Sequence, residues 1–310
     1  MPALPQPLLE RLERQFGQST RDAIVAAFGA ERRTTLRVNT LKATDDEIMN
    51  VFRDQAIQFE RVKGIPHAFG IKNRKDKELL EMPIAQEGKI YLQGLTSMLP
   101  PFIVDPKPGE MILDLCAAPG SKTSQMAAMM ALPRSAGESE GDQAGRIVAC
   151  EDNEIRFQKL ANTMRVQGAS VVDAKHVDAT LLHHEMPEAF DKVLADVPCG
   201  AEGRVNSKDV RSFSFWSEKN IIANAKLQRR LLRSAVGLLK PGGMLVYSTC
   251  TLAPEENEDM VAWLMEEFPF MKPQPVTLPF PSRKGPHGEA TLLPTKDYEG
   301  FFVAKLVKKT

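Results

Sequence analysis

"ILDLCAAPGSKTSQMA" occupies residues 112–127 and decides the fold, because it reads as a strand, a tight turn and a helix in direct succession. The apolar run MILDL (111–115) leads into small residues and one glycine, Gly120. In parallel α/β sheets, ligands bind beyond the carboxyl ends of the strands, where backbone N–H groups and a helix N-terminus are free. The stretch therefore predicts an α/β domain with a ligand site at this turn.

The turn lacks the glycines of two common phosphate-binding loops. A P-loop needs adjacent Gly and Lys, but Ser121 separates Gly120 from Lys122, and the position for its first glycine holds Leu115. The dinucleotide pattern G-x-G-x-x-G is also absent from the turn. A pyrophosphate therefore has no obvious cradle, and a smaller cofactor is favoured.

Short apolar runs recur beyond this stretch and define the domain. RIVAC (146–150), FDKVLAD (190–196) and MLVYS (244–248) each read as a strand, with helical stretches between them. This alternation is typical of a parallel sheet covered by helices. We therefore expect an α/β domain over residues 108–310, with a polar, Gly/Ser-rich insertion at 133–145 that is predicted to be flexible.

Two elements near the C-terminus have clear local signals. Ser217 is a favourable N-cap for a long helix that runs to about residue 239, where K-P-G-G ends it. EGFFVAKLVKK (299–309) then reads as the last strand.

Residues 1–107 have a different pattern and predict a separate N-terminal region. Residues 1–30 show the spacing of a packed helix pair, TTLRVNTLK (34–42) alternates like a strand, and Thr44 opens a T-D-D-E capping box. The segment 61–77 is the most basic in the chain. It is either a solvated charged loop or a contact for phosphates.

Composition sets the class of protein. The 310 residues are 43% hydrophobic, and 40 Lys and Arg balance 40 Asp and Glu, so only local clusters can signal nucleic-acid binding. No apolar run approaches the roughly 20 residues that cross a bilayer. The N-terminus resembles neither a secretory nor a transit peptide. We expect a cytoplasmic protein that has no membrane segment.

The four cysteines are scattered singly, at Cys116, Cys150, Cys199 and Cys250. Without a CxxC pair or a histidine at finger spacing, no metal site is expected. Disulfides are also not expected in a cytosolic chain. The cysteines are therefore either packing residues or reagents, and Cys150, which ends RIVAC, is read as packing.

Acidic residues follow four successive predicted strands, as Asp114, Glu151, Asp178 and Asp196. With the insertion removed, Glu151 follows Gly120 at a spacing near the roughly 20 residues usual before an acid that binds ribose hydroxyls. Asp178 could meet an adenine edge, and Asp114 could hold the turn or meet a cationic ligand. Each acid alone is typical of a cap or turn. Together they favour S-adenosylmethionine, which carries ribose, adenine and a cationic centre.

Two cysteines directly follow neighbouring predicted strands, as Cys199 in DVPCG and Cys250 in YSTCT. Adjacent parallel strands would bring both to one edge of the sheet. Cys250 precedes Pro254, which marks a helix start, and a helix N-terminus favours the thiolate form of a nearby thiol. The pair predicts nucleophilic chemistry.

One class of methyl transfer requires a cysteine. Carbon 5 of a pyrimidine is barely nucleophilic, but a thiolate that adds to carbon 6 makes it an enamine that attacks a sulfonium methyl group. A base then removes the carbon-5 proton, and the thiolate leaves. Asp196 would stabilise the adduct through hydrogen bonds at N3 and the exocyclic amine. The residues alone leave open which cysteine attacks.

At this point the sequence resembles the Sun-type family of RNA (cytosine-5) methyltransferases, bacterial ribosomal-RNA type, with its RsmB- and RsmF-like members. The motifs that carry the resemblance extend from about residue 36 to the end of the chain: LRVNTLK, IYLQGLTSMLPP, ILDLCAAPGSKTSQMA, VACEDNEIR, VDAT, DKVLADVPCG, LLKPGGMLVYSTCTLAPEENE and EGFFVAKL. The resemblance implies a Rossmann-like class I methyltransferase domain with a mostly parallel seven-stranded sheet. It also implies a small α+β N-terminal domain that resembles an RNA-recognition fold.

The resemblance also implies roles for named residues. Cys250 would be the nucleophile, and Cys199 would help to release the methylated base. S-adenosylmethionine would be bound by Glu151, Asp178, Asp196 and the turn residues Cys116, Ala117, Ala118, Pro119, Gly120, Ser121 and Lys122. Where the family often has aspartate at the ribose position, this chain has Glu151. The longer side chain of glutamate should still reach the ribose hydroxyls.

The expected partner is RNA, rRNA first and tRNA second, with the protein as a monomer. A single-stranded or flipped-out cytosine is required, because carbon 5 cannot be attacked inside a stack. Besides 61–77, weaker candidates for phosphate contact are Lys208, Arg211, Lys226, Arg229 and Arg230. The alternatives are a DNA cytosine-5 methyltransferase, in which Cys199 would attack, and a non-catalytic RNA-binding or ribosome-assembly factor.

Overall fold

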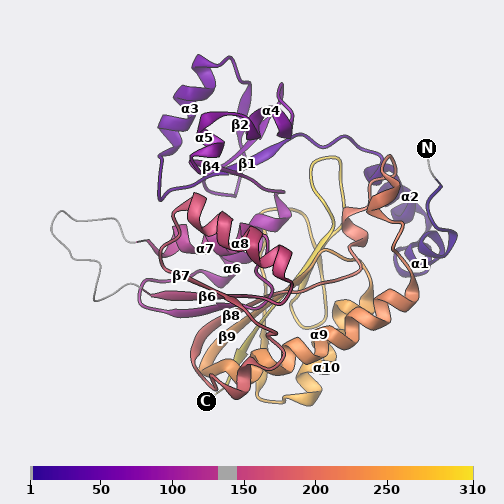
Figure 1. The fold of residues 1–310 in the computed structure, drawn as a ribbon. Helices are drawn as coiled ribbons and strands as arrows, with labels where there is room; N and C mark the ends of the chain where they lie inside the picture. The colour runs from indigo at the N-terminus through magenta and orange to yellow at the C-terminus, as the bar shows by residue number, and fades with distance from the viewer. Residues whose placement is uncertain (1–2, 132–144, 310) are drawn as a thin grey trace.

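The computed structural model describes residues 3–131 and 145–309 (Figure 1). Residues 133–144 of the predicted insertion lie outside the described residues. The α/β class is confirmed, with a large mixed sheet and a smaller four-stranded sheet near the N-terminus.

Five parallel strands form one side of the large sheet, in the order β9-β8-β5-β6-β7, and β7 is an edge strand. They are β5 (Met111–Asp114), β6 (Arg146–Glu151), β7 (Val172–His176), β8 (Phe190–Asp196) and β9 (Leu239–Thr249). Their carboxyl ends therefore meet at one edge. This edge carries the predicted site.

Antiparallel strands extend the sheet beyond β9, and they make it larger than the predicted seven strands. β13 (Phe301–Lys308) pairs with β9, and β10 (Met271–Gln274), β12 (Ala290–Leu292) and β11 (Arg283–Lys284) follow, giving nine strands among the described residues. The sequence pattern obscured the extra strands because residues 271–287 contain five prolines. Proline is tolerated in such short edge strands.

Helices cover both faces of this sheet (Figure 1). On one face lie α6 (Leu99–Val104), α7 (Ser121–Met130) and α8 (Glu154–Gln167), and on the other lie α9 (Glu218–Leu238) and α10 (Glu258–Glu267). The predicted start of the long helix is confirmed, because the Ser217 hydroxyl accepts the Asn220 N–H at 3.2 Å. Short 3-10 turns are η1 (Thr96–Met98), η2 (Leu182–His184), η3 (Glu202–Arg204), η4 (Val210–Ser212) and η5 (Pro254–Glu256).

The small sheet has the βαββαβ arrangement of a ferredoxin-like fold, in agreement with the predicted α+β domain. Its strands β1 (Thr35–Val38), β2 (Phe59–Arg61), β3 (Ala68–Ile71) and β4 (Ile90–Leu92) are antiparallel in the order β2-β3-β1-β4. The helices are α3 (Asp45–Asp54), α4 (Asp76–Leu80) and α5 (Pro83–Gln86). The capping box predicted at Thr44 begins α3, with both reciprocal hydrogen bonds present.

The predicted N-terminal helix pair consists of α1 (Gln6–Phe16) and α2 (Gln18–Phe28). Its apolar stripe packs against Val205, Phe213 and Leu252, which belong to loops of the large-sheet part. The four-stranded sheet has its own separate core. The first helices therefore contact the loop that follows β9, although they precede the small domain in the chain (Figure 1).

Candidate active site

The cofactor turn after β5 is fixed by backbone hydrogen bonds. The Ala117 N–H donates to the Cys150 carbonyl at 2.9 Å, and the Gly120 N–H donates to the Ala117 carbonyl at 2.8 Å. Gly120 has a φ of +104°, and a Cβ there would lie 2.6 Å from the Met164 methyl carbon. Glycine is therefore required where the turn enters α7.

Asp114 is a fully buried carboxyl at the end of β5. The Thr123 hydroxyl donates to its Oδ2 at 2.7 Å, and burial raises the pKa of Asp114 to about 7. Within the described residues, Oδ1 has no hydrogen-bond partner. A buried, unpaired acceptor at a ligand-binding turn is suited to receive a donor from a bound amine.

Glu151 and Asp178 follow the next two strands of the same edge. Glu151 is only 3% exposed and accepts the Asn153 N–H at 3.1 Å, while Arg156 lies 3.2 Å from its other oxygen. Asp178 is more open, and it accepts the Thr180 N–H at 2.9 Å like a turn residue. Both carboxylates are thus held by their own loops at the positions that the sequence predicts.

Lys122 joins the cofactor turn to the end of β8. Its Nζ lies 2.6 Å from Oδ2 of Asp196 and donates to the Ser97 hydroxyl at 3.0 Å. The Ser248 hydroxyl donates to the other oxygen of Asp196 at 2.7 Å. Both oxygens of Asp196 are therefore engaged, which fixes the orientation of this carboxylate beside the cysteines.

The structure brings Cys199 and Cys250 together at the ends of β8 and β9. Their sulfur atoms lie 3.2 Å apart, and the Cys250 N–H points to the Cys199 sulfur at 3.3 Å. The thiol–thiol hydrogen bond lowers the pKa of Cys250; burial opposes this, and the Arg204 guanidinium adds to the lowering. The same hydrogen bond and burial raise the pKa of Cys199. The Arg204 guanidinium therefore favours the thiolate form of Cys250.

Two buried carboxylates link the loop after β8, called the Cys199 loop, to the loop after β9, called the Cys250 loop. Glu256, from the Cys250 loop, accepts the backbone N–H of Gly200 at 3.0 Å. Glu202, from the Cys199 loop, accepts the N–H of Leu252 at 3.2 Å and the indole N–H of Trp216 at 2.7 Å. Each loop thus supplies an acceptor to the backbone of the other. We call Glu202 and Glu256 the reciprocal carboxylates.

A backbone contact further ties the Cys199 loop to the chain that precedes β13. The Gly203 N–H donates to the carbonyl of Cys250 at 2.9 Å, and the Gly300 N–H donates to the carbonyl of Gly203 at 2.9 Å. A Cβ on Gly203 would lie 2.3 Å from the Gly300 oxygen, so no side chain fits there. This close approach places the adjacent Arg204 beside Cys250.

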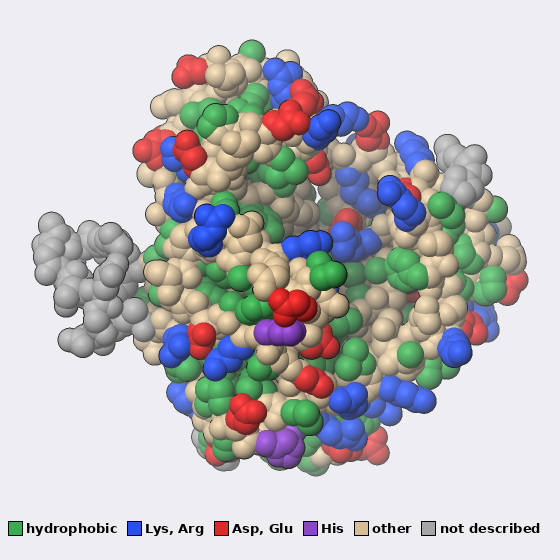
Figure 2. Space-filling model, viewed as in Figure 1, with side chains coloured by type: hydrophobic (Ala, Val, Ile, Leu, Met, Phe, Trp, Pro, Cys, Tyr) green, Lys and Arg blue, Asp and Glu red, His purple; other side chains and the backbone are tan. Residues whose placement is uncertain are grey.

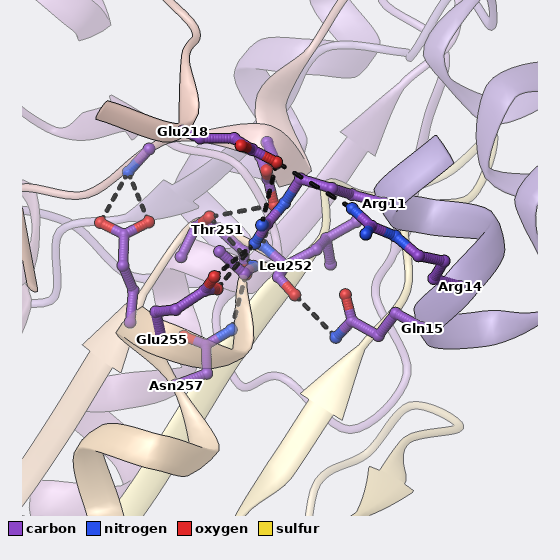
Figure 3. Close-up of polar contacts among 12 residues, drawn as sticks. Arg11, Arg14, Gln15, Glu218, Thr251, Leu252, Glu255 and Asn257 are labelled. Atoms are coloured by element: carbon purple, nitrogen blue, oxygen red, sulfur yellow. Dashed lines mark hydrogen bonds and ion pairs between the residues drawn. The ribbon is translucent and has the colours of Figure 1, made fainter. Parts of the chain in front are cut away.

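Helix α1 supports the Cys250 loop from outside (Figure 3). One guanidinium nitrogen of Arg11 donates to both carboxylate oxygens of Glu255, at 2.7 and 2.9 Å, and Gln15 donates to the Leu252 carbonyl at 2.9 Å. Arg11 also lies 3.5 Å from Glu218 at the start of α9. The N-terminal helix is therefore part of the scaffold that positions the loop.

The sequence analysis did not identify Arg37. Its side chain links the small domain to the cofactor turn through hydrogen bonds. From β1, its guanidinium donates to the carbonyl of Ser121 at 3.2 Å and to the hydroxyl of Ser124 at 2.6 Å. Burial lowers the pKa of Arg37 to about 10. In the strand pattern, Arg37 looked like an ordinary charged residue, and no local signal showed that it is buried.

The basic segment 61–77 is largely paired with acids. The ion pairs are Arg61 with Asp45, Lys72 with Glu60, Arg74 with Glu78 and Lys75 with Glu31. These contacts favour the solvated charged loop over a free phosphate-binding surface. Phosphate contact by this segment stays a prediction.

Replacing Glu202 with alanine tests the reciprocal carboxylates. The change leaves the buried N–H of Leu252 and the partly buried indole N–H of Trp216 without their acceptor, and a buried orphaned donor costs about 1–3 kcal/mol. We expect urea unfolding to show this loss. The neighbouring control Glu255→Ala, which removes a partly exposed carboxylate, should cost less. Equal losses in the two variants would contradict a special role for Glu202.

Neither a metal cluster nor a membrane span is found in the part of the chain that the structure describes. No group of three or more His, Cys, Asp or Glu residues could hold a metal ion there. No described helix is both long and apolar enough to cross a membrane.

Comparison with known proteins identifies the group to which this site belongs. A family model described as 16S rRNA methyltransferase RsmB/F matches residues 101–307. The chain belongs to the RsmB/F family. A second model, the ferredoxin-like domain of RsmF/B-like methyltransferases, matches residues 4–77. The predicted family resemblance is therefore confirmed.

Curated relatives and solved structures agree with the RsmB/F assignment. The chain is 36% identical to ribosomal RNA small subunit methyltransferase F of Shewanella loihica and 37% identical to that of an Enterobacter species, over 93% of this chain and 59% of each relative. It thus spans about three fifths of their length. A methyltransferase homologue from Pyrococcus horikoshii aligns with a TM-score of 0.79 at 30% identity, over 98% of this chain and all of that one. NSun6 from the same organism, solved with SFG, shares the fold, with a TM-score of 0.85 at 23% identity over 99% of each chain.

The buried carboxyls predict how the stability of this RsmB/F chain depends on pH. Burial raises the pKa of Asp114 and of Glu256 to about 7, from ordinary values of 3.8 and 4.5. Between about pH 4 and pH 7 the folded state therefore binds more protons than the unfolded state, so these groups lower the free energy of unfolding as pH rises. Urea unfolding of the wild type and Glu256→Gln should show a smaller decline for the variant. Parallel pH profiles would contradict the assignment.

Proposed function

We propose that the protein is an RNA (cytosine-5) methyltransferase that uses S-adenosylmethionine and acts on ribosomal RNA. The observation that carries the proposal is the pair of thiols, Cys199 and Cys250, 3.2 Å apart at the ends of β8 and β9 beside Asp196. Methyl transfer to oxygen or nitrogen needs no thiol, whereas transfer to carbon 5 of a pyrimidine does. An rRNA substrate would place the protein in the cytoplasm.

The residues around the turn suit S-adenosylmethionine. Oδ1 of Asp114, without a hydrogen-bond partner among the described residues, is a buried acceptor for an amine, and Glu151 ends β6, where an acid that binds ribose hydroxyls is expected. The proposed cofactor site comprises Cys116, Ala117, Ala118, Pro119, Gly120, Ser121, Lys122, Glu151, Asp178 and Asp196. When bound, S-adenosylmethionine supplies an electrophilic methyl group.

The chain's own residues would then perform the covalent chemistry on the pyrimidine. The Cys250 thiolate adds to carbon 6, which makes carbon 5 nucleophilic. Asp196, held by Lys122 and Ser248, would accept hydrogen bonds from the exocyclic amine and from N3, which takes up a proton as the adduct forms. Cys199 assists loss of the carbon-5 proton, after which Cys250 leaves. The Arg204 guanidinium beside Cys250 supports this order, because it lowers the pKa of the Cys250 thiol.

The surface offers a place for RNA. Figure 2 shows a hollow between the small domain and the part that carries α1 and α2, with Lys and Arg side chains gathered around it. Positive charge at a concave surface attracts the phosphate backbone, although the chain as a whole is neutral. The target base must be unpaired or flipped out to reach the cysteines.

The test is methyl transfer from labelled S-adenosylmethionine to 16S rRNA, naked or in small ribosomal subunits, with DNA of the same sequence as a parallel substrate. We expect label in RNA as 5-methylcytosine and none in DNA. Label at another atom of the base would contradict the chemistry, and label only in DNA would contradict the substrate.

A further inference from the structure

A small cavity lies beside Cys199, on the side of α9. Its volume is about 180 Å³, and its walls include Cys199, Gly200, Phe215, Trp216, Asn220 and Asn224. Sites for drug-sized ligands usually measure roughly 300–1,000 Å³, so this cavity suits a single ring system.

The walls combine aromatic rings with side-chain amides. Phe215 is 49% exposed and so has a ring face open to solvent, whereas the indole of Trp216 is fixed by its hydrogen bond to Glu202. The Asn220 amide donates to the Phe215 carbonyl, and the side chain of Asn224 lines the same cavity. An aromatic face stacks on a nucleobase, and an amide pairs with the donors and acceptors along its edge.

The cavity is not placed for the base that is methylated. That base must contact Cys250 and Asp196, and neither of these residues lines the cavity, whereas Cys199 does. Cys199 both lines the cavity and contacts the sulfur of Cys250 at 3.2 Å. A base in the cavity would therefore belong to a nucleotide next to the target.

Positive charge flanks the cavity along α9. Lys219 and Lys226 stand about one helical turn on either side of Ala223, which lines the cavity. Neither lysine has an ion pair within residues 3–131 and 145–309. Unpaired lysines beside a base-sized cavity suit contacts with the phosphates that flank one nucleotide.

We propose that this cavity binds the base of the nucleotide adjacent to the target cytosine in single-stranded RNA. Phe215 stacks on that base, and Asn224 reads its edge, so the cavity contributes to the choice of sequence around the methylated position. The inference rests on the proposed RNA methyltransferase activity and assigns that activity a second base-binding site.

The experiment uses short RNAs that contain the position methylated by the wild type in 16S rRNA. Each neighbour of the target is replaced in turn by the other bases and by an abasic nucleotide, and kcat/KM is measured for wild type, Phe215→Ala and Asn224→Ala. Ile222→Ala is the matched control, because Ile222 is 54% exposed on the same helix and does not line the cavity.

We expect one abasic neighbour to lower kcat/KM of the wild type and of Ile222→Ala by about 10-fold or more, the scale of one stacked base. In Phe215→Ala this penalty should shrink to within about 2-fold, and in Asn224→Ala the preference among the four bases should flatten. A wild type indifferent to abasic neighbours, or the same penalty and preference in all four proteins, would overturn the inference. Wild-type protein that methylates no RNA would instead overturn the proposed function.

Discussion

Replacing Cys250 with alanine is expected to abolish methyl transfer to RNA. Without the thiolate, carbon 5 of the cytosine is not activated, so kcat/KM should fall on the order of 10⁴-fold or more, as when other enzymes lose a nucleophile. Filter-binding counts of labelled RNA would measure the loss. S-adenosylmethionine binding should persist, because the turn from Cys116 to Lys122 is unchanged.

Cys150→Ala is the matched control for this variant. Cys150 is a buried thiol of the same sheet, at the end of β6, and burial raises its pKa to about 12, so it is not a reagent. Its carbonyl, which accepts the Ala117 N–H, is retained in the variant. We expect lower thermal stability but continued methyl transfer. Activity in Cys250→Ala comparable to that of this control would remove Cys250 from the mechanism.

Replacing Cys199 with alanine is expected to trap the protein on its RNA. Addition by Cys250 needs only its own thiolate, whereas release needs help at carbon 5, so the covalent adduct should accumulate. Turnover should fall about 10²–10⁴-fold, the contribution of a general acid or base. A denaturing gel would show a slow band that carries both protein and RNA.

Two controls distinguish this adduct from tight binding. The double variant Cys199→Ala, Cys250→Ala should give no slow band, because it lacks the attacking thiol. Leaving out S-adenosylmethionine should lower the amount of stable adduct, because addition then reverses. A slow band from Cys250→Ala but not from Cys199→Ala would reverse the two roles and favour the order of attack of the DNA enzymes.

The parts of this site that sequence predicts are those with local signals. The strand and turn around Gly120, the N-cap at Ser217 and the capping box at Thr44 each lie within a few residues of their partners. Cys199 and Cys250 are 51 positions apart, but both follow recognisable strands. A parallel order of adjacent strands was enough to place them together.

The parts that sequence did not predict depend on tertiary contacts. Glu202 and Glu256 look like ordinary loop acids until the two loops meet and each carboxylate accepts the other loop's N–H. Arg37 and Arg11 act across 84 and 244 positions, on Ser121 and Glu255. Hydrophobic period and capping patterns carry no information on such pairs, because both are properties of neighbouring residues.

The most direct test of the account is to find which sulfur bonds to the pyrimidine in the wild-type protein. 16S rRNA that contains 5-fluorocytidine offers no carbon-5 proton to remove, so the adduct cannot be resolved once the methyl group is added. After digestion, mass spectrometry of the cross-linked peptide should locate the bond at Cys250, and only when S-adenosylmethionine was present. A cross-link at Cys199, or no cross-link while unmodified rRNA is methylated normally, would contradict the account.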